Sequence, residues 1–131
     1  MRASEVMIAD PIVVAAGATS SEVAALMRTK NISVVPVVDN PKDRRYLGTI
    51  SDRDVVTECV GLGHDPSDCS VQDHARTDTP VVKPETELKG YEVPKQQDHH
   101  VRTTIVVVDD GKRVVGFIPH PEEVQGIIIA P

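Results

Sequence analysis

The stretch "GTISDRD" (Gly48–Asp54) places a glycine, a hydroxyl and a carboxylate at the expected start of a helix. Free N–H groups at a helix N-terminus bind phosphate readily, and Ser51 adds one more donor for such an anion. A carboxylate such as Asp54 can accept hydrogen bonds from the two vicinal hydroxyls of a ribose. Gly48 lets a ligand approach the backbone closely. The pattern is therefore compatible with a site for a nucleotide.

The same residues are also typical of a helix cap. In a capping box, an N-cap hydroxyl accepts from an early backbone N–H, and the acid three residues later accepts from the N-cap N–H. Ser51 and Asp54 have that spacing, and such a cap stabilises a helix by about 1 kcal/mol without any ligand. Spacing alone favours the cap, although the two roles can coexist. Arg53 supplies a cation beside Asp52 and Asp54.

A second stretch, "GFIPHPE" (Gly116–Glu122), occupies the matching place in the second half of the chain. Pro119 stands where the first copy has Ser51, and proline has neither a hydroxyl nor a backbone N–H. Pro121 removes another donor from the same turn. We therefore expect Gly116 and Glu122 to form at most a weak second site, and a structural closure is favoured.

The chain repeats itself over residues 33–56 and 103–124, where an apolar run, a polar turn and a second apolar run follow one another. This order is typical of a hairpin. A short apolar run precedes each copy, at Ile12–Val14 and at Val81–Val82. The predicted unit is β-α-β-β-α, used twice, with domains at 1–62 and 71–131 and a linker at 63–70. Two such units can share one core, whereas one alone is marginal.

Helix signals differ between the copies. In the first, Thr19 or Ser20 can cap a helix whose residues Val23, Leu26, Met27 and Lys30 share a face. In the second, Gly90 and Pro94 fall inside the corresponding segment, so we expect it to be short, kinked or irregular. A further helix is expected over residues 52–59, with Gly61 past its end and with Val55, Val56 and Cys59 on its apolar face.

Composition favours strands buried on both faces, since the 131 residues are 40% hydrophobic but only 2% aromatic, and valine dominates the apolar runs. The net charge of -6 argues against a nucleic-acid partner, which needs a basic surface. No apolar run approaches the roughly 18 residues of a membrane span, and no signal peptide is evident. A cytoplasmic location is the expectation.

Cysteine and histidine do not predict a metal site or a catalytic centre. His99 and His100 are adjacent and point to different faces, while His74 and His120 are distant in sequence. Cys59 and Cys69 are expected to be reduced in the cytoplasm, which disfavours a bridge between them. No nucleophile and base are paired by spacing. We expect no metal and no enzymatic activity.

Taken together, the two copies resemble a tandem pair of CBS (cystathionine β-synthase) domains, the Bateman module, over nearly the whole chain. The resemblance rests on "VPVVD" (Val35–Asp39), "GTISDRDVV" (Gly48–Val56) and "IVVVDDGKRVVGFI" (Ile105–Ile118). The first half, together with "GLGHDP", is most similar to small stand-alone CBS pairs of the hypoxic-response type. The resemblance implies an α/β (α+β) fold with pseudo-twofold symmetry, often assembled as a homodimer.

The resemblance also implies clefts between the repeats that bind AMP, ADP, ATP or S-adenosylmethionine as regulatory ligands. Gly48, Ser51 and Asp54 match the ligand motif of the family, so Ser51 would face a phosphate and Asp54 the ribose. No basic residue stands just before Val35, where many nucleotide-binding members have one, so AMP or S-adenosylmethionine suits this acidic chain better than ATP. The full set of expected ligand contacts is Val35, Pro36, Gly48, Thr49, Ser51, Arg53 and Asp54.

Two functions remain open at this point. The first is a non-enzymatic regulatory module that senses one adenosyl ligand per chain. The second is a CBS scaffold that binds no nucleotide and acts through homodimerisation or by docking to a partner protein. The degraded second motif and the missing basic residue favour the second function, whereas the intact first motif favours the first.

Overall fold

The computed structural model describes residues 1–88 and 104–118 of the chain. It divides into two compact units, which we call the middle unit (Ile12–Asp78) and the split unit (Met1–Pro11 with the residues from Thr79 onward). The split unit takes its first residues from the start of the chain, a division different from the predicted repeat boundaries at 1–62, 63–70 and 71–131. Those boundaries, as limits of sequence repeats, stay a prediction.

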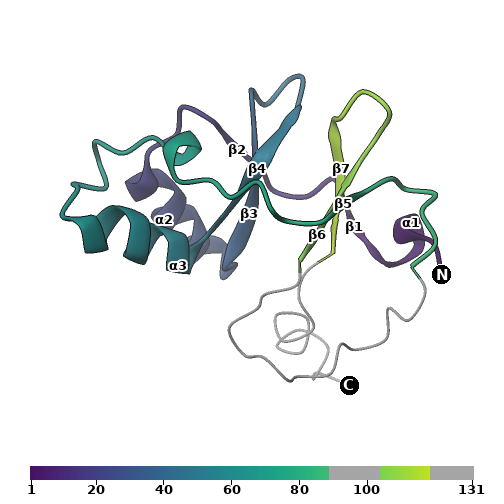
Figure 1. Cartoon of the computed structure of the whole chain (residues 1–131), viewed down its shortest axis with the longest axis horizontal. Coiled ribbons are helices and arrows are strands. Elements are labelled where there is room, and N and C mark those ends of the chain that lie inside the picture. Colours follow the sequence, from purple (N-terminus) through teal and green to yellow (C-terminus); the bar gives the residue numbers. More distant parts are fainter. Residues whose placement is uncertain (89–103, 119–131) are drawn as a thin grey trace, which may run out of the picture. The chain divides into compact units, whose positions relative to one another are not determined.

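The middle unit is built on a sheet in the order β2-β3-β4 (Figure 1). Its strands are β2 (Val14–Ala15), β3 (Val34–Val38) and β4 (Tyr46–Ser51). β2 runs parallel to β3, and β3 pairs antiparallel with β4. Helix α2 (Ser20–Lys30) connects the two parallel strands, as such a crossover requires. Strand β2, at Val14–Ala15, begins two residues later than the strand predicted at Ile12–Val14.

Helix α2 begins and ends where its sequence signals lie. The Thr19 hydroxyl accepts from the Glu22 amide at 3.0 Å, and the Glu22 carboxylate accepts from the Thr19 amide at 2.9 Å. Asn31 closes the helix in the left-handed region (φ 55), a conformation that asparagine tolerates better than most residues. Val23 and Met27 are buried as predicted, whereas Lys30 is exposed.

A second helical segment follows β4 directly. It starts as α3 (Asp52–Asp54), widens into a π-helical turn (Val55–Cys59) and tightens into a 3₁₀ turn (Val60–Leu62). The predicted helix over residues 52–59 coincides with α3 and the π-helical turn, but Gly61, expected past its end, lies inside the 3₁₀ turn, which Gly63 terminates in the left-handed region (φ 82). Val55 and Cys59 are buried as predicted, but Val56 is 59% exposed.

The core of the middle unit lies between its sheet and these helical segments. It includes Val71, from a short 3₁₀ turn (Val71–Asp73) that packs beside the strands. Burial of valine and isoleucine side chains supplies most of the stabilisation, at about 25 cal/mol per Å² of apolar surface. The buried members are Val14, Ala16, Val23, Met27, Val35, Val37, Ile50, Val55 and Val71.

The split unit repeats this plan with one addition. Its sheet has the order β1-β7-β6-β5, formed by β1 (Ile8–Ala9), β5 (Val81–Val82), β6 (Ile105–Val108) and β7 (Val114–Ile118). β5 is parallel to β6, and β6 is antiparallel to β7. The added strand β1 follows a short helix, α1 (Ala3–Val6), and pairs antiparallel with β7.

The two hairpins are organised alike, although their loops differ in length, in agreement with the predicted repeat. A side-chain oxygen of Asp39 accepts from the amides of Asn40 and Arg45, and one of Asp109 accepts from those of Gly111 and Arg113. Each hairpin also has a register shift at the end of its first strand, at Val37/Val38 and at Val107/Val108. An aspartate that organises a turn is typical of such loops.

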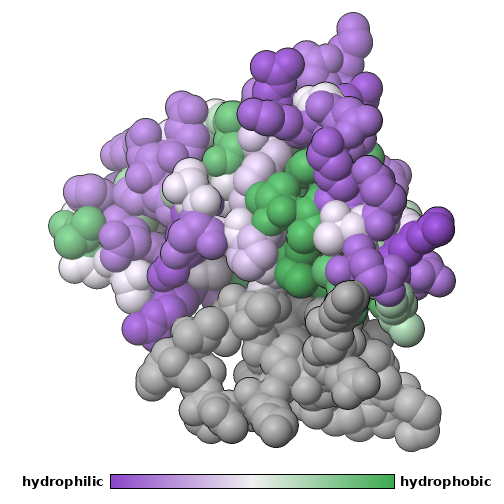
Figure 2. All heavy atoms as spheres, turned by 45° about the vertical axis from the view of Figure 1, so that its right-hand side comes forward, coloured by the Kyte–Doolittle hydropathy of each residue, from purple (hydrophilic) through white to green (hydrophobic). Residues whose placement is uncertain are grey.

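The fold class is the predicted mixture of strands and helices. The predicted irregular segment around Gly90 and Pro94 lies outside the described residues, as do His99, His100 and Glu122. Among the helices of the described ranges, none has the length and apolar character needed to span a bilayer. In the face drawn in Figure 2, hydrophilic side chains predominate and hydrophobic ones gather in a strip.

Candidate functional site

The capping box predicted at the start of α3 is present. The Ser51 hydroxyl accepts from the Asp54 amide at 3.1 Å, and the Asp54 carboxylate accepts from the Ser51 amide at 2.9 Å. The other amides of this turn also have protein acceptors, since Asp52 donates to the Ser33 carbonyl at 2.9 Å and Arg53 to the Asp52 carboxylate at 2.7 Å. The N–H groups expected to hold a phosphate are therefore engaged within the protein.

Asp54 also forms an ion pair that the sequence did not predict. Its second carboxylate oxygen accepts from Arg76 Nε at 2.8 Å. The Asp54 side chain is 2% exposed, whereas that of Arg76 is 56% exposed. The hydrogen bond and the charge of Asp54 raise the pKa of Arg76, which keeps the guanidinium charged. A buried carboxylate thus fixes a cation that stays accessible to solvent.

Gly48 has a structural role that requires no ligand. A Cβ at this position would lie 2.5 Å from the Arg76 carbonyl oxygen, closer than real contacts allow. The chain at Arg76 runs beside β4 and exchanges two backbone hydrogen bonds with Thr49, at 2.9 and 2.7 Å. The close approach predicted for a ligand is therefore made by the protein's own backbone.

Strands β3 and β4 bring the remaining predicted residues together. In their register Val35 lies opposite Ile50, and Pro36 opposite Thr49. Arg53 is exposed, and the other six predicted residues are buried. The structure thus places the predicted set along the paired strands β3 and β4 and at the start of α3. Binding of a ligand by these residues stays a prediction.

The predicted second site falls only partly within the described residues. Gly116 lies in β7 opposite Ala9, and a Cβ there would overlap the side chain of Met7. Met7 and β1 therefore cover Gly116 much as the chain at Arg76 covers Gly48. Glu122, the proposed partner of Gly116, lies outside the described ranges.

A second group of side chains with possible chemistry is Cys59, Cys69 and His74, which the sequence interpretation had set aside. Their ligand atoms, the two sulfurs and a ring nitrogen, all lie within 4.8 Å of one another. Both cysteines are free thiols, and Cys59 donates a hydrogen bond to Cys69 across 2.9 Å. The hydrogen bond with Cys59 and burial raise the pKa of Cys69 to about 11.

Sequence reasoning missed both Arg76 and this trio for different reasons. Arg76 is distant from Asp54 along the chain and belongs to no motif, so no local signal marks it. The trio did carry a signal, because cysteine and histidine alternate at regular five-residue steps in Cys59, His64, Cys69 and His74. The sequence does not show how the loop bends. In the structure, the bend brings Cys59, Cys69 and His74 together.

Comparisons with known proteins agree with this fold. The sequence profile of the CBS domain family matches residues 3–61. No curated protein sequence gives a significant match. Among solved structures, Hypoxic Response Protein I, described with two coordinated zinc ions, has a TM-score of 0.74 at 23% identity, with 96% of this chain and 98% of that chain covered.

Two further structures have the same fold. A putative acetoin utilization protein (AcuB) from Vibrio cholerae has a TM-score of 0.75 at 24% identity, covering 99% of this chain and 91% of its own. CbpB, solved in complex with c-di-AMP, has a TM-score of 0.72 at 16% identity, covering 99% and 85%. Residues 3–61 therefore match the CBS domain family, and the chain has the fold of these solved structures over nearly its whole length.

Proposed function

We propose that the chain is a non-enzymatic regulatory module that binds one adenosyl ligand, with AMP as the preferred candidate, at the edge formed by β3, β4 and the start of α3. The observation that carries this proposal is Arg76. Its guanidinium is held by buried Asp54 beside the Ser51 cap, yet more than half of its side chain is exposed. It supplies the cation that the sequence lacks in front of Val35.

The charge of the site favours a ligand with one phosphate. One guanidinium, already paired with Asp54, can attract a single phosphate, whereas the negative charge of a triphosphate would meet an acidic chain with a formal charge of -6. The complex of the relative CbpB with c-di-AMP supports an adenine ligand in this fold. Ser51 and Asp54 then act chiefly by fixing Arg76 and the turn.

Regulation would follow from a shift in population. A ligand that binds one conformation of the module better than another changes the fraction of molecules in that conformation. The surface presented to a partner protein would change with it. We further propose that the module works as a homodimer in the cytoplasm. Light scattering, which gives the molar mass of the purified protein in solution, tests the dimer.

The test is isothermal titration of AMP, S-adenosylmethionine, ATP and c-di-AMP into the protein. We expect saturable heat for AMP near one site per chain, and affinity about tenfold or more lower in Arg76→Met, because a charge-assisted hydrogen bond contributes about 1.5–3 kcal/mol. Arg28→Met, which removes an exposed arginine of α2 that is not among the expected ligand contacts, is the matched control. Equal affinity in both variants would place the phosphate elsewhere.

The second candidate function, a scaffold without a nucleotide, is favoured by a specific observation. The cap explains Ser51 and Asp54, and the backbone of Arg76 explains Gly48, so the motif is accounted for without any ligand. Absence of heat with all four compounds, from protein whose circular dichroism shows it folded, would support this function instead.

A further inference from the structure

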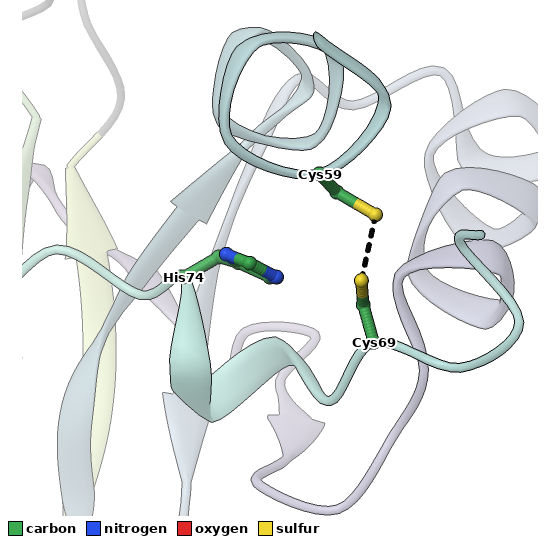
Figure 3. Close-up of side chains that lie close together, drawn as sticks. All are labelled: Cys59, Cys69 and His74. Atoms are coloured by element: carbon green, nitrogen blue, oxygen red, sulfur yellow. Dashed lines mark hydrogen bonds between the residues drawn. The ribbon is translucent and has the colours of Figure 1, made fainter. Parts of the chain in front are cut away.

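Cys59, Cys69 and His74 come from three different positions around one loop. Cys59 ends the π-helical turn, Cys69 lies in the loop that follows, and His74 comes directly after the 3₁₀ turn at Val71–Asp73. Figure 3 shows the two sulfurs facing each other, with the His74 ring directed toward the same space. Cys59 is fully buried, Cys69 is 8% exposed and His74 is half-buried.

The donor set is the one that zinc prefers. Structural zinc sites use thiolates and imidazoles in a tetrahedron, with Zn–S of about 2.3 Å and Zn–N of about 2.0–2.1 Å. These bond lengths place the ligand atoms about 3.5–3.8 Å apart. The present atoms lie within 4.8 Å of one another, with the two sulfurs 2.9 Å apart, so shifts of about 1 Å would open a tetrahedron. Two thiolates and a neutral imidazole would also leave the buried site uncharged.

The backbone around the three residues holds them in place. The Cys59 carbonyl accepts from the His64 amide at 3.0 Å, and the Cys69 carbonyl accepts from the Ser20 amide at 2.9 Å. The His74 amide donates to the Val71 carbonyl at 3.1 Å. The backbone of the three residues is therefore held in place before any metal arrives, which lowers the cost of ordering the site.

Neither a disulfide between Cys59 and Cys69 nor a hydrogen bond between their thiols explains why the His74 ring lies beside them. The sulfurs are 2.9 Å apart, well beyond a covalent S–S bond of about 2.05 Å. Within the part of the chain that the structure describes, the His74 ring has no hydrogen bond, and its one ring neighbour is His64, with centroids 6.2 Å apart. A metal gives both the thiols and the imidazole a partner at once.

We propose that Cys59, Cys69 and His74 bind a Zn²⁺ ion that fastens the end of the helical segment to the turn at Val71–Asp73. The fourth position is filled by water or, after rotation of its exposed side chain, by His64. The site is structural: it closes the loop 59–74 within the middle unit. It is independent of nucleotide binding, so failure of one proposal leaves the other intact.

The test starts from protein purified under a phosphine reductant and stripped with a chelator, in which a thiol assay after unfolding must count both cysteines. CoCl₂ is then titrated in, followed by competing ZnCl₂. We expect one Co²⁺ per chain, thiolate-to-cobalt charge-transfer absorption in the near ultraviolet, and the intense visible bands of a tetrahedral ion. ZnCl₂ should abolish these bands at one equivalent.

Three variants and one control assign the ligands. Cys59→Ser, Cys69→Ser and His74→Ala should each weaken binding at least about 100-fold, because removal of outer-shell partners alone costs 10–100-fold. Ser67→Ala, in the same loop, should bind as the parent does. Circular dichroism of the metal-free variants shows whether they fold. If a variant does not fold, the cobalt spectrum of the parent protein still tests the proposal. A spectrum without thiolate absorption, full binding by all three variants, or a Cys59–Cys69 disulfide that survives the reductant would overturn the proposal.

Discussion

The Asp54 side chain, 2% exposed, accepts from the Ser51 amide with one carboxylate oxygen and from Arg76 with the other. A buried carboxylate left without its partners would cost several kcal/mol, so the cap and the ion pair account for Asp54 before any ligand is considered. The charged group of this pair that solvent or a ligand can reach is the Arg76 guanidinium. A family motif can therefore be intact in sequence while its residues serve the protein's own turn.

Gly48 gives the sharpest test at this scale. In Gly48→Ala, the new Cβ would lie 2.5 Å from the Arg76 carbonyl, so the strand or its neighbour must move. We expect a loss of about 1–3 kcal/mol in the free energy of unfolding, as for other overpacked sites. Urea denaturation monitored by circular dichroism measures it.

Gly17→Ala is the matched control, because nothing lies within 4 Å of a Cβ at that position and its φ is not in the left-handed region. That substitution should be neutral or stabilising by up to about 1 kcal/mol, through a less flexible unfolded chain. If both substitutions had the same effect, the close approach of Arg76 would not be what requires a glycine at position 48.

The elements show how far local sequence signals reach. Thr19 with Glu22, and Asp39 with Asp109, predicted the start of α2 and the two hairpins, since each signal acts within a few residues. The π-helical turn was not predictable, because one extra residue in a turn leaves no mark on composition. The Val56 side chain is 59% exposed, although it was expected on the apolar face of the helix.

The cap of α2 predicts a defined pH dependence. Hydrogen bonds from Thr19, first from its amide and then from its hydroxyl, lower the pKa of Glu22 below its ordinary value of 4.5. A carboxylate with a lowered pKa contributes stability that is complete above 4.5 and is lost as pH falls through the folded value. Glu22→Gln should therefore be less stable than the parent at pH 7, and the difference should shrink below pH 4.5.

Thermal unfolding of both proteins across this pH range measures the effect. Ser21→Ala, on the exposed side of the same turn, removes no ionisable group, so its difference from the parent should not follow the titration. A Glu22→Gln difference that stayed constant down to the lowest pH would show that the charge of Glu22 contributes nothing to the cap.

At the scale of the whole molecule, the repeat could be predicted from the sequence. The pairing of the first eleven residues with the second half of the chain could not. Ile8–Ala9 is too short to show a strand period, and its partner Phe117 lies far along the chain. The ion pair of Asp54 with Arg76 left no local signal either, whereas Cys59, Cys69 and His74 had a regular spacing whose meaning only the folded loop shows. Contacts between distant segments depend on how the sheets assemble, and local spacing does not encode them.

The position of the first residues leads to a prediction about the whole chain. Within the described residues, Met1–Pro11 donates or accepts backbone hydrogen bonds with Pro84, Thr86, Leu88 and Val115, and it buries Ala3 completely. All of these contacts lie in the split unit. Deletion of residues 1–11 removes α1 and β1 and exposes the edge of β7, and an unpaired edge is prone to open and to associate.

Hydrogen–deuterium exchange should find this loss concentrated in one unit. In the deletion variant, we expect amides of β6 and β7 to exchange faster than in the parent, while those of β3 and β4 keep their protection, because the β3–β4 ladder lies wholly within the middle unit. A second variant replaces residues 1–11 by a glycine–serine segment of equal length. It keeps the length of the chain but lacks the contacts of α1 and β1, so it shows which of the two losses matters. Equal loss of protection in both hairpins would mean that the two units unfold as one cooperative body, and the division into a middle and a split unit would then describe geometry but not stability.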